Sequence, residues 1–350
     1  MNPEVLIRQA ARLADDLREF TGVFARRAGD LLSEPERTSI GNVYLVGDGD
    51  SYHAGCATEP AFASIGEVPC RAAGAFRFAA YDSRWALRPG ARRALVVAVT
   101  ASGSTPAVLT ALERAREAGA LTVAVTGTPG SPVTGAAERV LAVDLPDPEP
   151  SPGVRTYQAS LLGLLLIALR LGGAEALHAE LASLADPVAA THEAAGPRAR
   201  AEAEHVAAFP GTIVLGSGPN HGTAMFAAAK LAESAGLLAL GQDLEEWAHV
   251  ERWAQPADLP VYVLAPPGHA HGHAGAIAAR ARELGRRVVV VAEHGDAAAT
   301  RAAHATFEVA GRAREEFSPF LYHLFAVHLA ARVAQRLGRH PFQSILQENP

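Results

Sequence analysis

The sequence predicts an α/β fold of two tandem three-layer αβα units with parallel, flavodoxin-like sheets, preceded by an N-terminal helix. Short apolar runs rich in valine alternate with helical patterns, as in a parallel sheet that is covered on both faces. A polar glycine turn follows the first apolar run of each half, at residues 47–51 and 216–222. The whole succession repeats at a spacing of about 170 residues, which indicates two copies of one unit.

Composition and charge exclude several classes of protein. The 350 residues are enough for two domains, and 49% hydrophobic with 19% charged residues is typical of a packed globular chain. A net charge of −6 without a basic block gives no support to nucleic-acid binding. Cys56 and Cys70 form no CxxC pair, so neither a disulfide framework nor a thiolate metal site is expected. Charged residues near the N-terminus and the lack of a membrane-length apolar run predict a cytoplasmic protein.

The first half is expected to hold a lead-in helix and five strands separated by helices. Apolar residues recur at helical spacing through residues 3–33. The expected strands are residues 42–46, 68–72, 94–99, 121–126 and 139–143, and the expected helices are 52–63, 107–118, a turn and short helix at 129–136, and the apolar 156–171. A proline-rich loop over 146–152 leads into the last helix.

The second half is expected to repeat this order after an alanine-rich helical connection over residues 172–200. The expected strands are residues 212–215, 260–265, 287–292 and a weak 307–309, and the expected helices are 223–234, 274–284 and 319–338. The predicted boundaries are a lead-in at 1–35, a first domain at 36–172, a helical linker at 173–205 and a second domain with a tail at 206–350.

The corner at residues 94–113 carries the first functional signal. A buried strand, 94–99, ends in the hydroxyl-rich 100–105, and a helical pattern begins at Pro106, a favourable first-turn residue. Such a corner directs backbone N–H groups and hydroxyls to one point at the positive end of a helix dipole. It is therefore an anion cradle, most often for phosphate, although the same turn also serves as an ordinary helix cap. Ligands of parallel sheets bind at this edge, beyond the carboxyl ends of the strands.

An ordered set of motifs resembles the double sugar-isomerase (SIS) family. The motifs of the first half are Gly49-Asp50-Ser51-Tyr52, Thr100-Ala101-Ser102-Gly103-Ser104-Thr105 and Gly153-Val154-Arg155-Thr156-Tyr157-Gln158-Ala159, similar to G-T-S, S-x-S-G-x-T and G-V-A-S-T-K-A. Those of the second half are Lys230-Leu231-Ala232-Glu233 and Glu246-Trp247-Ala248-His249, similar to K-L-K-E and E-L-K-H-G-P. Over roughly residues 1–345 the chain resembles the isomerase domain of glucosamine-6-phosphate synthase and related phosphosugar deaminases and deglycases. The resemblance implies two SIS-type units.

The resemblance also implies which residues bind the substrate. The hydroxyls of Ser51, Thr100, Ser102 and Thr105, together with backbone amides near Ala101 and Gly103, would hold a sugar phosphate, and Val154 and Thr156 would line the sugar. This agrees with the anion cradle predicted from the corner itself. A homodimer with sites at the subunit interface is implied as well, because the family's ring-opening histidine typically comes from a neighbouring subunit.

By the same resemblance, Glu233 would move a proton between C1 and C2 of an open-chain sugar, and His249 would open the ring. A carboxylate whose pKa is raised by partial burial suits enediol chemistry, and an imidazole suits protonation of the ring oxygen. Lys230 lies three residues before Glu233 on one helix face and would orient it, and Glu246 counts among the candidate catalytic residues. No cofactor is needed. A Lys-x-x-Glu pair is also common on solvated surfaces, as is a lone histidine beside Trp247.

Four departures from the family pattern limit what is implied. Asp50 replaces a threonine beside the phosphate, with Asp48 close by, and Ala101 replaces a glutamine. Val250-Glu251 replaces Gly-Pro after the histidine, and Leu346 falls where the synthases carry a lysine. With no expected glutamine-hydrolysing domain, these departures disfavour aminotransfer. Asp50 could instead bind an ammonium or a hydroxyl.

The sequence thus favours a phosphosugar isomerase, or an amino-sugar phosphate deaminase or deglycase. The alternatives are a non-catalytic sensor of sugar phosphates and an enzyme acting on a non-phosphorylated sugar derivative. A dinucleotide-binding oxidoreductase is disfavoured, because the glycine turns lack a third glycine in the right place. His269, His271 and His273 have the pattern of a solvated loop without acidic partners rather than a metal site, so no metal is expected.

Overall fold

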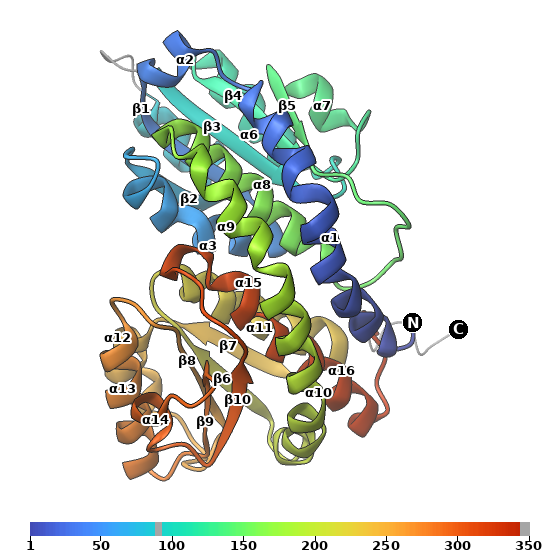
Figure 1. Ribbon diagram of the computed structural model, residues 1–350, viewed down its shortest axis with the longest axis vertical. Coiled ribbons are helices and arrows are strands. Elements are labelled where there is room, and N and C mark those ends of the chain that lie inside the picture. The colour runs from blue at the N-terminus through green and yellow to red at the C-terminus, as the bar shows by residue number, and fades with distance from the viewer. Residues whose placement is uncertain (88–92, 344–350) are drawn as a thin grey trace. The chain divides into compact units, whose positions relative to one another are not determined.

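A computed structural model of the chain describes residues 1–87 and 93–343 (Figure 1). Two compact units are distinguished. The first-sheet unit comprises Asp15–Pro148 and Arg155–Ser183, and the second-sheet unit comprises Met1–Ala14, Glu149–Val154 and the chain from Leu184 onward. The N-terminal helix α1 (Glu4–Gly29) contributes residues to both units. Each unit is described by itself.

The first-sheet unit contains a five-stranded parallel sheet in the order β2-β1-β3-β4-β5. Its strands are β1 (Ile40–Gly47), β2 (Cys70–Gly74), β3 (Arg93–Thr100), β4 (Leu121–Thr126) and β5 (Arg139–Ala142). Every residue of β4, and β3 from Leu95 onward, is buried. This explains why continuous apolar runs identified the strands, because both faces of a parallel sheet are covered.

Helices cover both faces of the first sheet. They are α2 (Glu34–Ser39), α3 (Asp50–Ser64), α4 (Ala75–Arg77), the π-helix η1 (Phe78–Asp82), α5 (Ser83–Ala86), α6 (Pro106–Glu117), α7 (Pro132–Ala136), α8 (Arg155–Gly172), η2 (Glu175–Leu177) and α9 (His178–Ser183). On one face α6 packs Val108 and Leu112 against Val96. On the other, Gly163 of α8 lies against Val125. The result is a three-layer unit.

The second-sheet unit also holds five parallel strands, in the order β10-β9-β8-β6-β7. Its strands are β6 (Gly211–Leu215), β7 (Leu238–Gln242), β8 (Val261–Ala265), β9 (Val288–Glu293) and β10 (Ala305–Val309). Taken along the chain, the strands of each sheet therefore follow the same spatial order. In both, the second strand lies at the edge, the first lies between the second and the third, and the third is central.

Helices likewise cover both faces of the second sheet. They are α10 (Ala185–Ala207), α11 (Pro219–Ala235), α12 (Leu244–His249), η3 (Glu251–Trp253), α13 (His271–Glu283), α14 (Ala297–Thr300), η4 (Glu315–Phe317), α15 (Pro319–Tyr322) and α16 (Leu324–Leu337). α12 and α13 pack Trp247 and Ile277 against the sheet on one face. On the other, the ring of Phe325 on α16 stacks on that of Tyr262 and lies tilted against that of Phe307.

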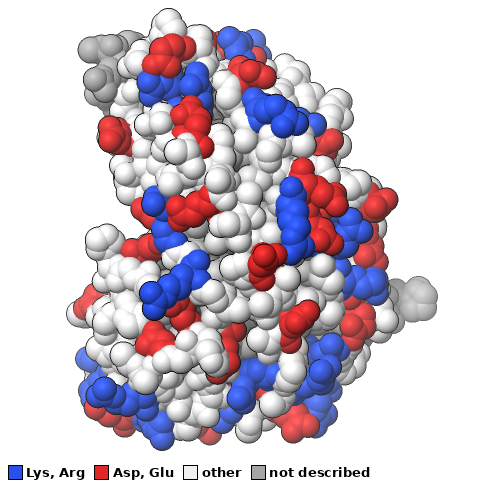
Figure 2. Space-filling model, viewed as in Figure 1, with Lys and Arg blue, Asp and Glu red and all other residues white. Residues whose placement is uncertain are grey.

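The predicted fold class, two parallel α/β units with an N-terminal helix, is confirmed, and three local features differ from expectation. Strand β7 and helix α12 occupy a stretch in which no element was predicted. The segment Ala75–Ala86 is helical. The expected helix at 319–338 is interrupted at His323, between α15 and α16. Within residues 1–87 and 93–343, no helix has both the length and the apolar character needed to span a membrane. Acidic and basic side chains are intermingled on the face shown in Figure 2.

Candidate functional site

The corner between β3 and α6 gathers three hydroxyl groups. Thr100, the buried last residue of β3, accepts the N–H of Gly103 at its Oγ1 (3.1 Å). The same oxygen lies 3.3 Å from Thr105 Oγ1 and 3.5 Å from Ser102 Oγ. Ser102 is exposed and Thr105 is half-buried, so these hydroxyls border solvent. The corner therefore offers hydroxyls held at hydrogen-bond spacing for an incoming oxyanion.

The loop after β4 fixes the backbone of this corner. Gly103 has a φ of +67°, and a Cβ placed on it would lie 1.8 Å from Ser131 Oγ. Its carbonyl accepts the N–H of Val133 (2.9 Å), and the carbonyl of Ala101 accepts the Thr128 hydroxyl (2.8 Å). Only glycine fits at residue 103, because both the conformation and the space exclude a side chain. The sequence analysis missed Thr128 and Ser131, because they follow the next strand along the chain, β4, and not the strand that carries the motif.

The N-terminus of α6 completes the cradle. Thr105 is the N-cap residue, but within the described residues its side chain makes no cap hydrogen bond. Its hydroxyl lies next to Thr100 instead. The first amides of this twelve-residue helix, with the positive end of the helix dipole, face the same corner as the hydroxyls. This arrangement suits a dianion such as phosphate.

Ser51 lies at the same edge of the sheet, after the neighbouring strand β1. Val46 of β1 is in register with Ala98 of β3, so the two strands end side by side. A Cβ on Gly47 would lie 2.9 Å from Ser51 Cβ and 3.1 Å from the carbonyl oxygen of Val99. This close approach holds Ser51 against the strand ends.

The turn between β1 and α3 holds the carboxylates of Asp48 and Asp50, and each lies near a partner within the unit. Asp48 Oδ1 accepts the backbone N–H of Ala75 (3.0 Å), which ties it to the end of β2. Asp50 is the first residue of α3, and its Oδ1 lies 3.8 Å from Nδ1 of His53. A carboxylate in the first turn of a helix is stabilised by the helix dipole. The turn therefore holds two acidic groups in fixed places beside the hydroxyl cradle.

A buried ion pair positions the start of α8. Arg155 donates from Nε to Asp16 Oδ2 and from Nη2 to Asp16 Oδ1, both at 2.7 Å, and both side chains are buried. Asp16 raises the pKa of Arg155. Nη1 also reaches the carbonyls of Pro146 and Asp147. The next residue, Thr156, is exposed in the first turn of α8. The sequence analysis missed this pair, although Arg155 stands where the family motif has alanine.

The second-sheet unit carries the predicted lysine and glutamate on α11. Lys230 is fully buried, and its Nζ lies 2.6 Å from Glu233 Oε2 and 5.0 Å from the ring centre of Phe226. The Glu233 side chain is 34% exposed, so one end of the pair reaches solvent. A buried ammonium needs a close counter-charge, which fixes the carboxylate of Glu233 in one place. The carboxylate is thus anchored and half-exposed, and its role in proton transfer stays a prediction.

The predicted histidine and second glutamate lie on α12. His249 and Glu246 are both exposed. His249 Nε2 lies 2.9 Å from Glu245 Oε1, and the other carboxylate oxygen of Glu245 lies 2.9 Å from His273 Nε2. Glu245 therefore connects α12 to α13. The sequence analysis did not single out Glu245.

The prediction for the histidine cluster is wrong for two of its three members. His271 and His273 lie in the first turn of α13 rather than in a loop. Both have acidic partners, since His271 Nε2 lies 2.6 Å from Asp296 Oδ2 and His273 pairs with Glu245. Their partners are distant in the sequence, so the local pattern could not reveal them. In the described part of the chain, no group of three histidine, cysteine or acidic residues could hold a metal ion.

The predicted residues fall into two groups. The first-sheet unit holds Asp50, Ser51, Thr100, Ala101, Ser102, Gly103, Thr105 and Thr156, and the second-sheet unit holds Val154, Lys230, Glu233, Glu246 and His249. Val154 is buried. Leu346, where the synthases carry a lysine, lies outside the described residues.

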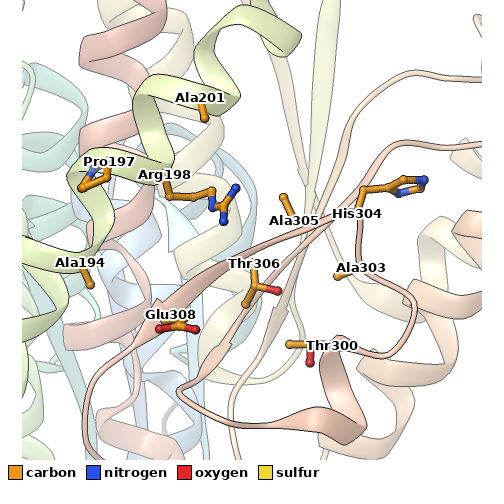
Figure 3. A pocket seen from close by; sticks show the side chains of 10 residues that line it. All are labelled: Ala194, Pro197, Arg198, Ala201, Thr300, Ala303, His304, Ala305, Thr306 and Glu308. Atoms are coloured by element: carbon orange, nitrogen blue, oxygen red, sulfur yellow. The ribbon is translucent and has the colours of Figure 1, made fainter.

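The second-sheet unit also has an open groove of about 690 Å³ beside the edge strand β10 (Figure 3). Arg198 of α10 lines one side of the groove and Thr306 of β10 lines another, and Thr300 and His304 line it near the amino end of the strand. Ligands of parallel sheets bind at the opposite, carboxyl edge. The groove is lined by none of the predicted site residues.

Comparison with known proteins adds the family. Residues 38–170 match the SIS domain. Glutamine–fructose-6-phosphate aminotransferase [isomerizing] of Mycobacterium tuberculosis H37Rv is 30% identical over 304 residues, covering 82% of this chain and 47% of that protein. The enzyme of the same name from Mycolicibacterium paratuberculosis is 29% identical over 279 residues, covering 76% of this chain and 44% of that protein. The chain thus spans about half the length of these relatives.

Solved structures match the fold along nearly the whole chain. The C-terminal domain of glucosamine-fructose-6-phosphate aminotransferase from Francisella tularensis has a TM-score of 0.82 at 15% identity, covering 97% of this chain and 98% of that one. Tagatose-6-phosphate ketose/aldose isomerase from Escherichia coli has a TM-score of 0.80 at 16% identity (98% and 95% covered). Glucosamine-6-phosphate deaminase from Thermotoga maritima has a TM-score of 0.73 at 17% identity (96% and 97% covered). At these identities the likeness shows the fold alone.

Proposed function

Because residues 38–170 of this chain are a SIS domain, we propose that the protein acts on a sugar phosphate, as an isomerase or as an amino-sugar phosphate deaminase or deglycase. The observation that carries the proposal is the hydroxyl-lined corner of Thr100, Ser102 and Thr105 at the N-terminus of α6. The names of its relatives and structural neighbours, which include ketose/aldose isomerase and deaminase activities, agree with it.

In this proposal the first-sheet unit binds the phosphate. Three of the phosphate oxygens would accept hydrogen bonds from the hydroxyls of the corner, from Ser51 and from the first amides of α6. Thr156, exposed at the start of α8, would contact the sugar, with Val154 just before it in the sequence. Gly103 allows the backbone to approach the phosphate closely, because it has no side chain.

The second-sheet unit would supply the proton transfer. Glu233 would remove the proton at C2 of the open-chain sugar and return it to C1 through a cis-enediol, or the reverse. Lys230 holds the Glu233 carboxylate at 2.6 Å and so fixes its direction. His249 would open the sugar ring by protonating the ring oxygen, and Glu246 would lie beside it on α12. The chemistry proceeds without a cofactor.

The remaining parts of the proposal concern organisation. We expect the two units to be SIS-type domains bounded near residues 36–172 and 206–350. The protein would act in the cytoplasm as a homodimer. Aminotransfer is the least favoured reaction of the family, because the sequence has Leu346 where the synthases carry a lysine.

The test is proton exchange at C2. Glu233→Gln should lower the exchange of the C2 proton with deuterated buffer by about 10³-fold, because the amide cannot take the proton. Binding of the same sugar phosphate should stay within a few-fold. Hexose, pentose and amino-sugar phosphates would first be screened by thermal shift, and the exchange would then be followed by NMR. Glu204→Gln, an exposed acidic residue on α10, is the matched control. Unchanged exchange in Glu233→Gln would refute the proposed role.

One observation favours a second candidate, a sugar derivative without a phosphate. Asp50 already places a carboxylate at the first residue of α3, beside the cradle, where it would repel a dianion. Competition separates the candidates, since excess inorganic phosphate should displace a sugar phosphate but not an unphosphorylated sugar. Tight binding without exchange in the wild-type protein would instead indicate a sensor.

A further inference from the structure

The open groove beside β10 is used by no part of the proposed reaction (Figure 3). Its walls are one face of α10 and the stretch from Thr300 to Glu308, which contains β10. All of its lining residues belong to the second-sheet unit, so the groove is formed by that unit alone. Its volume of about 690 Å³ lies within the range of about 300–1,000 Å³ that is typical of sites for small organic ligands.

The groove is open because two neighbouring elements leave space between them. β10 is the edge strand of its sheet, so no further strand of the described residues fills the space beside it. The face of α10 that lines the groove has small apolar side chains besides Arg198, namely Ala194, Pro197 and Ala201, which recur at helical spacing. Side chains of this size cannot fill the space as far as the strand.

Contacts at both ends of the groove hold α10 and the sheet at this separation. At the carboxyl end of β10, the backbone N–H of Ala310 donates to Thr191 Oγ1 of α10 (2.9 Å). At the amino end, Arg287, directly before β9, donates from Nη2 to Oε1 of Glu202 on α10 (2.8 Å). The Glu202 side chain is buried. The walls of the groove are therefore tied to each other at two points.

Three polar side chains that line the groove keep a hydrogen-bond donor available. Arg198 is exposed, and its guanidinium makes no hydrogen bond or ion pair with another described residue. Among the same residues, the hydroxyl of half-buried Thr306 also has no hydrogen-bond partner. His304 accepts the backbone N–H of Val288 at Nδ1 (3.1 Å), so its neutral ring carries the proton on Nε2. A groove that offers donors favours a ligand that carries acceptors.

The charges in and around the groove also favour an anion. Within the described residues, Glu308 is the only acidic side chain that lines the groove, and its Oε2 lies 2.9 Å from His294 Nδ1. Arg282 donates to the carbonyl of Ala303, which lines the groove (3.3 Å). The acidic group thus has a partner, whereas the positive charge of Arg198 has no counter-charge among the described residues.

We propose that this groove binds a small organic oxyanion, a phosphate ester or a carboxylate, with the guanidinium of Arg198 as its anchor. A planar guanidinium donates two parallel hydrogen bonds to two oxygens of either group. Thr306 and His304 would donate to the remaining lone pairs of these oxygens. The small apolar side chains of α10 leave room for the uncharged part of the ligand.

The groove shares no residue with the hydroxyl corner of the first sheet, so this proposal does not depend on the proposed function. The corner lies at the carboxyl edge of its sheet, whereas the groove begins near the amino end of β10. A ligand held in the groove would be an effector rather than a substrate, because none of the proposed catalytic residues lines it.

Side-chain NMR of His304 is the first test, because this residue lines the groove and its ring responds to local charge. Burial lowers the pKa of His304, and the nearby charges of Arg282 and Arg287 lower it further, against the opposite effect of Glu202. A bound anion stabilises the imidazolium, so it should raise that pKa. Titration with inorganic phosphate at constant ionic strength should shift the ring signals along a saturating curve, with a dissociation constant of about 1 mM.

Succinate forms the second arm of this titration. Saturation by phosphate alone supports the proposal and identifies a phosphate ester, and saturation by succinate alone supports it and identifies a carboxylate. Saturation by both supports the shared chemistry. Shifts that stay linear with both anions, or that only match those of His205, exposed on α10 outside the groove, would overturn the proposal.

Substitutions on α10 form the sharper test, because they report where the anion binds. Arg198→Met should weaken binding by about 10-fold or more, the loss expected for charge-assisted hydrogen bonds. Arg200→Met is the matched control, since Arg200 is exposed on the same helix but does not line the groove, and it should bind within about twofold of wild type. Ala201→Glu should abolish saturation, because it places a carboxylate in the groove. Circular dichroism confirms that each variant is folded.

Equal weakening in Arg198→Met and Arg200→Met would show that the anion responds only to the net charge of the helix, and it would overturn the proposal. Undiminished saturation in Ala201→Glu would do the same. The titrations need no sugar, so their failure and the failure of the proposed reaction are distinguishable.

Discussion

At the carboxyl edge of each sheet, the turn after the first strand has the same backbone conformation, but the side chains around it differ. Gly49 precedes α3 with φ 55° and ψ −130°, and Gly218 precedes α11 with φ 56° and ψ −132°. Beyond this shared turn the side chains diverge. Ser51, two residues after Gly49, borders the hydroxyl cradle of the first sheet, whereas Asn220, two residues after Gly218, is buried and donates from Nδ2 to Ser318 Oγ (2.7 Å).

The corner after the third strand shows the same contrast. In the first sheet it holds the hydroxyls of Thr100, Ser102 and Thr105. In the second it holds a carboxylate of the chain itself, because Glu315 Oε2 accepts the N–H of His269 (2.9 Å). The same side chain packs so closely on Gly268 that a Cβ there would lie 2.3 Å from Glu315 Cδ. The comparison teaches that one topology makes two corners after the third strand, one occupied by a carboxylate of the chain itself and one lined by hydroxyls, which the proposed function assigns to the phosphate.

The largest expected effect concerns the corner of the first sheet. Gly103→Ala should lower the free energy of unfolding by about 3 kcal/mol, because the new methyl group meets Ser131 and the backbone is left-handed. Gly338→Ala, at a left-handed position (φ 64°, ψ 28°) where a Cβ meets open space, should cost only about 1 kcal/mol. Urea unfolding measures both. Equal losses in the two variants would show that Ser131 does not restrict the corner.

The second prediction concerns the effect of acid on the free energy of unfolding, through a buried histidine of the second-sheet unit. Burial lowers the pKa of His323, in the second-sheet unit, to about 4, from an unfolded value near 6.5. The neutral ring is required in the folded state, so its contribution is intact above pH 6.5 and is lost as the pH falls toward 4. Between pH 7.5 and pH 5 the free energy of unfolding should fall by about 2 kcal/mol from this group. His323→Asn should reduce that fall, whereas His340→Asn, at an exposed position, should not; a pH dependence identical in all three proteins would contradict the assignment.

The smallest expected effect concerns the filled corner. Glu315→Ala should cost about 1 kcal/mol, the worth of the hydrogen bond to His269. Gly268→Ala should cost less in the Glu315→Ala background than in the wild type, because the clash with the carboxylate is gone. The affinity for a sugar phosphate should not change in either variant. A double-mutant cycle by urea unfolding gives the coupling, and zero coupling would mean that Glu315 does not fill the corner.

The sequence was most informative where partners are neighbours along the chain. The apolar runs predicted the buried strands, because parallel strands are covered on both faces. Strand β7 was missed, since Leu238 and Leu240 are exposed on an edge strand and Gly241 breaks the pattern. Gly241 is needed there, because a Cβ would lie 2.5 Å from the backbone of Met225 on α11.

The same rule holds for the candidate site. The hydroxyl cradle was predictable because residues 100–105 make it almost alone. Thr128 and Ser131, which support the backbone of the cradle, come from the loop after the next strand. The acidic partner of His271 lies 25 positions further along the chain. Contacts of this kind follow from the tertiary fold, which no local pattern encodes. The roles of Glu233 and His249 stay predictions until proton exchange is measured.

The ion pair between Asp16 and Arg155 has a consequence for how the chain is made. Its members are 139 positions apart, so α1 leaves the ribosome long before its partner exists. Until α8 emerges, Asp16 lacks this partner, so the first-sheet unit cannot finish assembling before Arg155 has been synthesised. A fragment that starts after α1 would keep Arg155 buried without a counter-charge, at a cost of about 3–5 kcal/mol. Helix α1 is thus synthesised well before the helix whose arginine fixes it in place.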